Sequence, residues 1–141
     1  MQIAEAADHP FTLYSGLFDL GLAHLRRGDL PRATWSSSGA STSAERGSIV
    51  VGTPVVAATL GAAYALAGRA DEALPLVAGA VEEFRGRQIH IWPALILLCA
   101  GMTYLPAGRI DEAASHAREA LGAHPPAGGS GKRGPRALPR R

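Results

Sequence analysis

Histidine and cysteine side chains, which could bind a metal or act as nucleophiles, are dispersed along the sequence. The histidines are His9, His24, His90, His116 and His124. They show neither a paired helical spacing nor a recurring carboxylate neighbour, so the pattern does not support a zinc site. The single cysteine, Cys99, lies in an apolar run, where burial would raise its pKa and leave an inert thiol. We therefore predict no metal site and no cysteine nucleophile.

Adjacent acidic residues form three pairs, which are Asp71-Glu72, Glu82-Glu83 and Asp111-Glu112. Neighbouring residues on a helix point in different directions, so these pairs do not predict an acid/base dyad. The sequence Gly131-Lys132 is similar to the end of a phosphate loop, but Arg133 replaces the required Ser or Thr and no glycine stands five residues earlier. We predict no catalytic residue, no cofactor-binding residue and no cofactor, and hence not an enzyme.

The composition is that of one folded domain with a tail of different charge. The chain has 141 residues, of which 47% are hydrophobic, and a formal net charge of +2. Five of the 14 basic residues lie in the last ten positions, which contain no acidic residue. The single cysteine excludes an intrachain disulfide, and the first ten residues lack the pattern of a secretory signal. These features predict a cytoplasmic protein whose folded part has no basic surface for nucleic acid.

A pattern of small residues recurs three times with a period of 40 residues. Its members are Gly21, Gly28 and Ala33, then Gly61, Gly68 and Ala73, then Gly101, Gly108 and Ala113. In each unit an apolar stretch runs through the first glycine, where a second helix could approach closely. The second glycine is suited to end that helix, and an acidic pair follows it in the second and third units. Each unit therefore predicts a helical hairpin.

The residues of these units resemble the tetratricopeptide repeat. Leu60-Gly61, Tyr64 and Ala73 match its signature, and the third unit repeats the aromatic residue as Tyr104, whereas the first has His24. The later aromatic of the signature is replaced by Ser37, Val77 and Ala117. The period also exceeds the usual 34 residues by 6. A HEAT-like array of similar period therefore stays open as an alternative.

The resemblance implies an all-α fold of antiparallel helical hairpins, stacked as a right-handed superhelix of about three repeats. The expected helices run over residues 10–27, from 29 onward, and over 54–67, 71–84, 93–107 and 111–121. We assign residues 1–124 to this repeat domain and 125–141 to a basic, Pro/Gly-rich disordered tail.

Residues 34–52 are the weakest part of the predicted domain. The run from Trp35 to Ser43 is rich in serine and shows no apolar stripe, so we expect a weak or disordered stretch there. The 40-residue register continues on both sides, and a compensated pair of frameshifts in the gene is one hypothesis for a normal length with this composition.

Residues 89–108 contain no charged side chain, which raises the alternative of a membrane span. The repeat register argues against it, because Pro93, Gly101 and Tyr104 fall where a hairpin requires a helix start, a close contact and an aromatic residue. We therefore predict buried core and no membrane partner.

If first helices line a concave face, as the resemblance implies, nine apolar residues form a groove. They are Phe18, Leu22, Leu25, Ala58, Ala62, Ala65, Leu98, Met102 and Leu105. Such a face would take an amphipathic helix or flanking repeats and no small-molecule substrate, while nucleic acid is disfavoured. The predicted function is a non-catalytic scaffold for protein–protein interaction. The alternative is a detached repeat fragment of a larger bacterial nucleotide-signalling protein, because the long-period repeats also resemble those of adenylate-cyclase-like and ATPase-type regulators.

Overall fold

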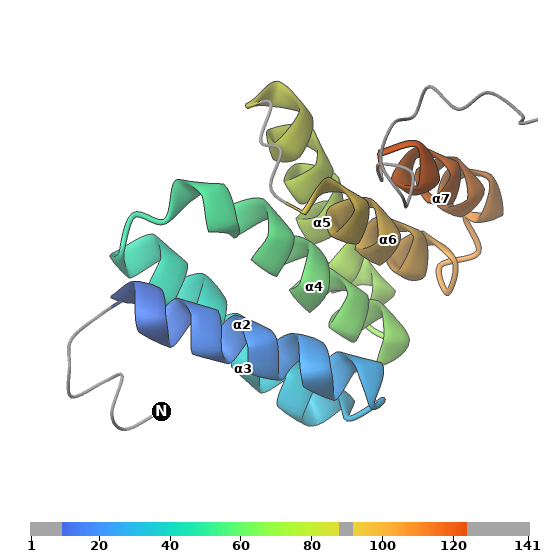
Figure 1. The fold of residues 1–141 in the computed structure, drawn as a ribbon. Helices are drawn as coiled ribbons and strands as arrows, with labels where there is room; N and C mark the ends of the chain where they lie inside the picture. Colours follow the sequence, from blue (N-terminus) through green and yellow to red (C-terminus); the bar gives the residue numbers. More distant parts are fainter. Residues whose placement is uncertain (1–9, 88–91, 124–141) are drawn as a thin grey trace, which may run out of the picture.

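The structure, a computed structural model, describes residues 10–87 and 92–123, and these residues form helices joined by short turns. The α-helices are α2 (Pro10–Arg26), α3 (Leu30–Arg46), α4 (Thr53–Leu66), α5 (Ala70–Gly86), α6 (Pro93–Tyr104) and α7 (Ile110–Ala123). A short 3-10 helix, η1 (Val50–Gly52), precedes α4. The predicted all-α fold is confirmed, and the described part of the chain contains no strand (Figure 1).

The helices pack in three hairpins that stack on one another. Neighbouring helices pair as α2 with α3, α4 with α5 and α6 with α7. The first helix of each later hairpin also packs on both helices of the hairpin before it, so α4 contacts α2 and α3, and α6 contacts α4 and α5 (Figure 1). The predicted stack of antiparallel hairpins is therefore present, while its right-handed superhelical sense stays a prediction.

The turn inside each hairpin is built the same way. Its glycine adopts a left-handed conformation, with φ of +76° at Gly28, +83° at Gly68 and +77° at Gly108, which side chains other than glycine rarely adopt. The backbone N–H of Arg69 donates to the carbonyl of Tyr64 at 2.8 Å, closing the helix end. Equivalent bonds join Asp29 to His24 and Arg109 to Tyr104.

An arginine side chain packs against the second of these turns. The guanidinium of Arg69 lies 4.2 Å from the centre of the Tyr64 ring and pairs with Glu72 at 2.6 Å. The third turn repeats this arrangement with Arg109 over Tyr104 and paired with Glu112. Such exposed pairs stabilise a protein little individually.

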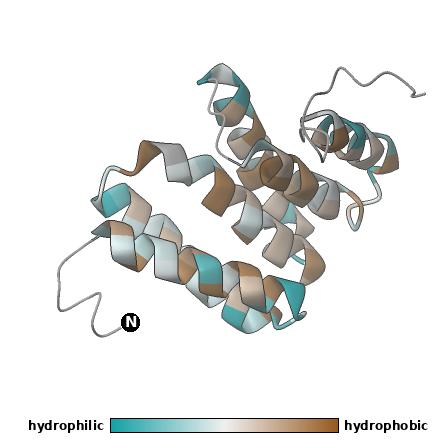
Figure 2. Ribbon diagram, viewed as in Figure 1, coloured by the Kyte–Doolittle hydropathy of each residue, from teal (hydrophilic) through white to brown (hydrophobic). Residues whose placement is uncertain are grey.

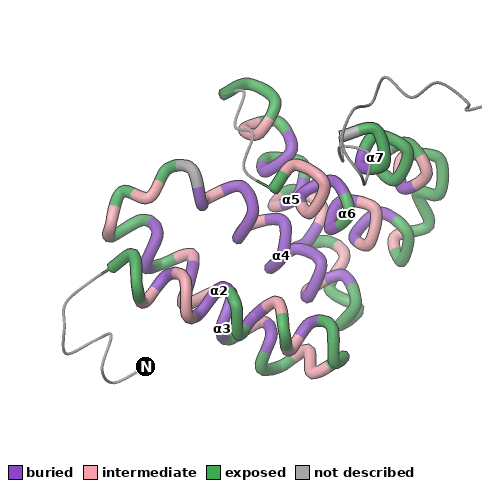
Figure 3. Tube along the Cα trace, in the orientation of Figure 1, coloured by how far each residue is buried: buried purple, intermediate pink, exposed green. Residues whose placement is uncertain are grey.

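The core is centred on α4, which is buried along nearly its whole length (Figure 3). Within its hairpin, a Cβ added at Gly61 would overlap Val77 of α5, so only glycine allows the two helices to lie this close. Ala73, at the start of α5, is fully buried against this contact. Small residues at the predicted repeat positions therefore set the separation of the helices.

The segment expected to be weak or disordered over residues 34–52 is largely helical. Asp29 caps α3 by accepting a hydrogen bond from the backbone N–H of Arg32 at 3.3 Å. The missing apolar stripe is replaced by a buried face of small residues, which are Ala33, Ser36, Ser37, Ala40, Ser43 and Ala44. Serine can occupy such a face because its side chain is small, even though the Ser37 hydroxyl has no hydrogen-bond partner among the described residues. Whether this helix is less stable than the others stays a prediction.

The uncharged run over residues 89–108 corresponds in part to α6, which is hydrophobic on nearly all sides (Figure 2). α6 has 12 residues, and Ile96, Leu97, Cys99 and Ala100 are buried. None of the helices in the described ranges is long and apolar enough to cross a bilayer. Residues 88–91 and the predicted tail at 125–141 lie outside the described residues.

Candidate functional site

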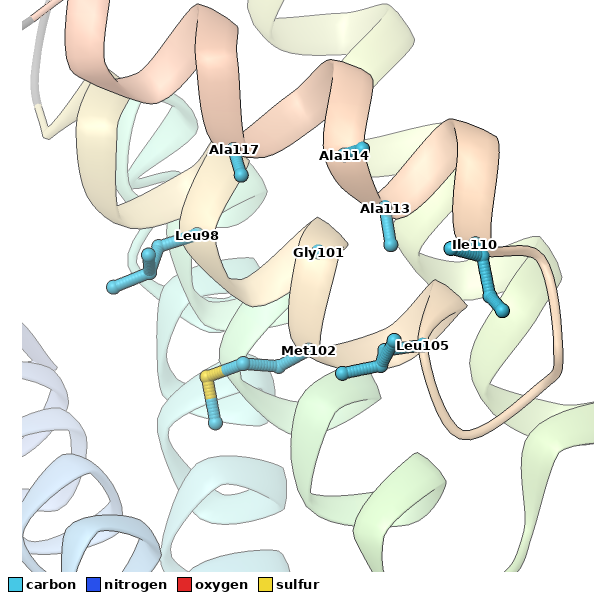
Figure 4. Close-up of a pocket in the computed structure, with 8 residues that line it drawn as sticks. All are labelled: Leu98, Gly101, Met102, Leu105, Ile110, Ala113, Ala114 and Ala117. Carbon is cyan, nitrogen blue, oxygen red and sulfur yellow. The ribbon is translucent and has the colours of Figure 1, made fainter.

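A groove runs between α6 and α7 on the face of the last hairpin that points away from α4 and α5. Its volume is about 350 Å³, which is in the range of ligand pockets. The lining residues are Leu98, Gly101 and Met102 from α6, Leu105 directly after it, and Ile110, Ala113, Ala114 and Ala117 from α7. Figure 4 shows Leu98 and Met102 on α6 and Leu105 just after it, projecting to the same side, with the alanines on the neighbouring helix α7. We call this surface the α6/α7 groove.

The α6/α7 groove exposes large apolar side chains to solvent. The exposed fractions are 53% for Leu98, 59% for Leu105 and 64% for Ile110. No charged or hydrogen-bonding side chain is among the lining residues. A surface of this kind favours an apolar partner and offers no group for catalysis.

The same positions one repeat earlier are covered by protein. Shifting the groove by 40 residues gives Ala58, Gly61, Ala62 and Ala65 on α4, with Ala70, Ala73, Leu74 and Val77 on α5. All of these are buried or half-buried, because α6 packs on α4 and α5. The α6/α7 groove is therefore the position that a further helix would occupy in the repeating arrangement.

The nine residues predicted to form one concave groove do not all lie on an open surface. Five of its nine residues are buried: Phe18, Leu25, Ala58, Ala62 and Ala65. The first helix of the following hairpin covers that face of the first and second repeats, so it cannot serve as one continuous open surface. Leu22 is half-buried, and only Leu98, Met102 and Leu105 line the α6/α7 groove.

The contribution of α7 to the groove is absent from the sequence prediction. That prediction assigned the surface to first helices alone, whereas Ile110, Ala114 and Ala117 supply its second wall. Their spacing of four and three residues places them on one face of a helix. This apolar spacing is the signal from which the second wall could have been found.

Among the predicted packing residues, the alanines Ala33, Ala73 and Ala113 are buried where each second helix begins. Gly21 lies against Ser37, in the same relation as Gly61 to Val77. Tyr104 is buried and stacks on His116 with ring centres 5.2 Å apart, whereas Tyr64 is half-buried.

The titratable groups of the described residues are not arranged for chemistry. No cluster of three or more His, Cys, Asp or Glu side chains there could hold a metal ion. Burial raises the pKa of the Cys99 thiol to about 11, which opposes formation of a nucleophilic thiolate. Glu72 and Glu112 pair with arginines in their turns. His9, His90 and His124 lie outside the described residues.

Two stretches of the chain match a known repeat family. The tetratricopeptide repeat profile matches residues 15–34 and 54–78, which span the first two hairpin turns and parts of their helices. Together with the paired helices of the described residues, these two matches are consistent with a tetratricopeptide-like repeat protein. The third hairpin, α6 and α7, follows in the same 40-residue register. Comparisons with curated proteins and with solved structures give no significant match.

Tetratricopeptide repeats are generally protein-interaction modules, and stacks of this type are generally not enzymes. The profile match favours the tetratricopeptide reading over the HEAT-like alternative. The narrower resemblance to adenylate-cyclase-like and ATPase-type regulators stays a prediction, since the match is to the repeat alone.

Proposed function

We propose that this tetratricopeptide-like protein is a non-catalytic interaction module whose α6/α7 groove binds an α-helix of a partner protein. The observation that supports this most directly is the 40-residue register, because the equivalent face of the preceding hairpin is already occupied by a helix, α6. The open groove has the same register positions and an apolar lining. A helix is therefore the occupant that matches its shape.

The two helices that already occupy such faces specify the partner. On α4 the buried residues include Val56, Thr59, Leu60 and Ala63, and on α6 the residues at the same register are Ile96, Cys99, Ala100 and Thr103. Thr59 also lies next to Cys99. Both sets follow an i, i+3, i+4, i+7 spacing with small or branched side chains. We infer that the partner helix presents a narrow apolar stripe of this kind, with no charge within the stripe.

A second copy of the chain is a poor occupant. The face of α2 in the same register carries Gly16, Asp19, Leu20 and Ala23. Stacking this face into the groove would bury Asp19 at the position held by Thr59 on α4 and Cys99 on α6. An unpaired carboxylate in an apolar contact is strongly unfavourable. This argument favours a partner of a different sequence over head-to-tail association.

The test is binding of a labelled synthetic helix, measured by fluorescence anisotropy. The probe carries the Val56, Thr59, Leu60 and Ala63 spacing on one face and Glu/Lys pairs elsewhere for solubility and helicity. We expect saturable binding to the full chain. Leu98→Glu is expected to weaken it at least about tenfold, because a charge enters the apolar contact.

Leu121→Glu is the matched control, since Leu121 is also on the last hairpin and 78% exposed but does not line the groove. It should leave binding unchanged. Equal loss of binding in both variants, or no binding of the probe to the unmodified chain, would contradict the proposed function. A concentration-dependent increase in mass without a probe would instead indicate self-association.

A further inference from the structure

A second cavity lies between α2, η1 and the start of α4. Its volume is about 320 Å³, and Trp92, just before α6, closes one side. The lining residues are Phe11, Tyr14, Ser15, Phe18, Asp19, Ile49, Gly52, Val55 and Trp92. We call it the aromatic pocket. It shares no residue with the α6/α7 groove.

Four of the eight aromatic residues of the chain gather at the aromatic pocket. Phe18 meets Trp92 edge to face, with ring centres 6.0 Å apart and planes at 83°. Tyr14 is stacked parallel to Phe18 at 6.1 Å, and Phe11 follows Tyr14 at 6.1 Å. These rings therefore lie at different inclinations around one cavity, and the face of an aromatic ring attracts a cation.

The inner rings are held in place, whereas the outer ones are accessible. Tyr14 and Phe18 are buried, and the Tyr14 hydroxyl donates to the carbonyl of Gly52 at 3.4 Å. Phe11 and Trp92 are 65% and 54% exposed. Buried rings thus form the floor and exposed rings form the rim, which leaves the pocket open to a solute.

The charge lining the pocket is negative. Among the described residues that line it, Asp19 is the only charged one, and within the described ranges Asp19 forms no ion pair. Burial raises the pKa of Tyr14, and the Asp19 carboxylate raises it further. A carboxylate beside aromatic faces, without a basic side chain in the lining, is complementary to a cation.

We propose that the aromatic pocket binds an organic cation of the quaternary ammonium class, with the cationic head against Phe18 and Trp92 and near the Asp19 carboxylate. A methylated ammonium suits these walls because it is bulky and lacks N–H donors, so it loses little hydration on contact with the rings. A primary ammonium is strongly hydrated and gains less there. This site is independent of the proposed helix-binding function.

The test uses Trp92 as the reporter. Trp35 is 69% exposed on α3 and does not line the pocket, so Trp35→Phe leaves Trp92 as the single tryptophan. Choline chloride is titrated into this variant at constant ionic strength, and its neutral isostere 3,3-dimethylbutan-1-ol is titrated in parallel. We expect saturable quenching by choline and at least about tenfold weaker binding of the alcohol.

Asp19→Asn removes the charge at nearly constant shape and should weaken choline binding several-fold while leaving the alcohol unaffected. Equal affinity for choline and the alcohol, or no saturable response to choline, overturns the proposal. Tighter binding of arginine amide than of choline also overturns the assignment to quaternary ammonium. A peptide containing trimethyl-lysine that binds better than choline supports it and identifies the source as a protein side chain.

Discussion

The same face of two consecutive hairpins differs in what covers it. On α4 and α5 the face is built from small residues and α6 lies on it, so Ala58, Ala62 and Ala65 are almost completely buried. On α6 and α7 the equivalent positions are Leu98, Met102 and Leu105, and they line an open groove (Figure 4). The two faces therefore share their repeat positions, but they differ in the size of their side chains and in whether a further helix covers them.

The first hairpin shows what the larger residues mean. Its equivalent positions are Phe18, Leu22 and Leu25, which are large like those of the open groove and are buried or half-buried because α4 packs on α2 and α3. Large residues at these positions are therefore compatible with a covering helix. This favours the α4 stripe over the α6 stripe as the template for a partner.

The largest expected contrast comes from placing a carboxylate on each face. Ala58→Glu is expected to destabilise the protein by on the order of 4 kcal/mol or more, since an unpaired charge is buried under α6. Leu98→Glu, at the same register position, should change the free energy of unfolding by less than about 1 kcal/mol because its side chain reaches water. Urea unfolding followed by circular dichroism measures both. Equal destabilisation would show that the two faces are not different in coverage.

The next contrast in stability is between Gly61 and Gly101, the glycines at the contact between the two helices of the second and third hairpins. Gly61→Ala is expected to cost about 1–2 kcal/mol, because the added methyl group overlaps Val77, whose branched side chain is stiff in a helix. At Gly101 an added Cβ would meet only the Ala113 carbonyl, at an ordinary contact distance of 3.5 Å. Gly101→Ala should therefore be neutral or stabilise by up to about 1 kcal/mol through helix propensity. Thermal melts of the two variants measure both effects. A destabilising Gly101→Ala would contradict the view that there is room for a methyl group at Gly101.

The fold was accessible from the sequence because its determinants are local and repeated. The left-handed Gly28, Gly68 and Gly108 and the 40-residue period fix where helices end. The open surface was not accessible, since Ala58 and Leu98 share a register position and only the stacking of α6 distinguishes them. The aromatic pocket joins Phe18 to Trp92 across more than 70 residues, and no local pattern encodes that contact. The buried face of α3 was also not accessible, because burial of serine is not visible in an apolar pattern.

The first hairpin can be made to resemble the second at one position. Ser37 occupies the site of Val77, and its buried hydroxyl has no hydrogen-bond partner among the described residues. Ser37→Val should stabilise the protein by about 1–2 kcal/mol, because it removes an unsatisfied polar group and adds apolar burial against Gly21. Thr42→Val, on an exposed position of the same helix, should stay within about 0.5 kcal/mol. A destabilising Ser37→Val would mean that α2 and α3 cannot adopt the spacing of α4 and α5.

The smallest expected effect is a pH dependence of the free energy of unfolding that arises at His116, on the last hairpin. Burial lowers the pKa of His116, and the nearby Arg85 lowers it further, against the opposing charges of Glu119 and Glu112. The unfolded chain therefore binds a proton at a higher pH than the folded chain does. As the pH falls, the free energy of unfolding decreases between about pH 6.5 and the lowered pKa, and above about pH 6.5 this contribution to stability is fully present. His116→Leu places the side chain of Leu76, its counterpart on α5, at this position and should reduce the difference in free energy of unfolding between about pH 5 and about pH 7.5. An unchanged difference in His116→Leu would show that the loss of stability arises at another group.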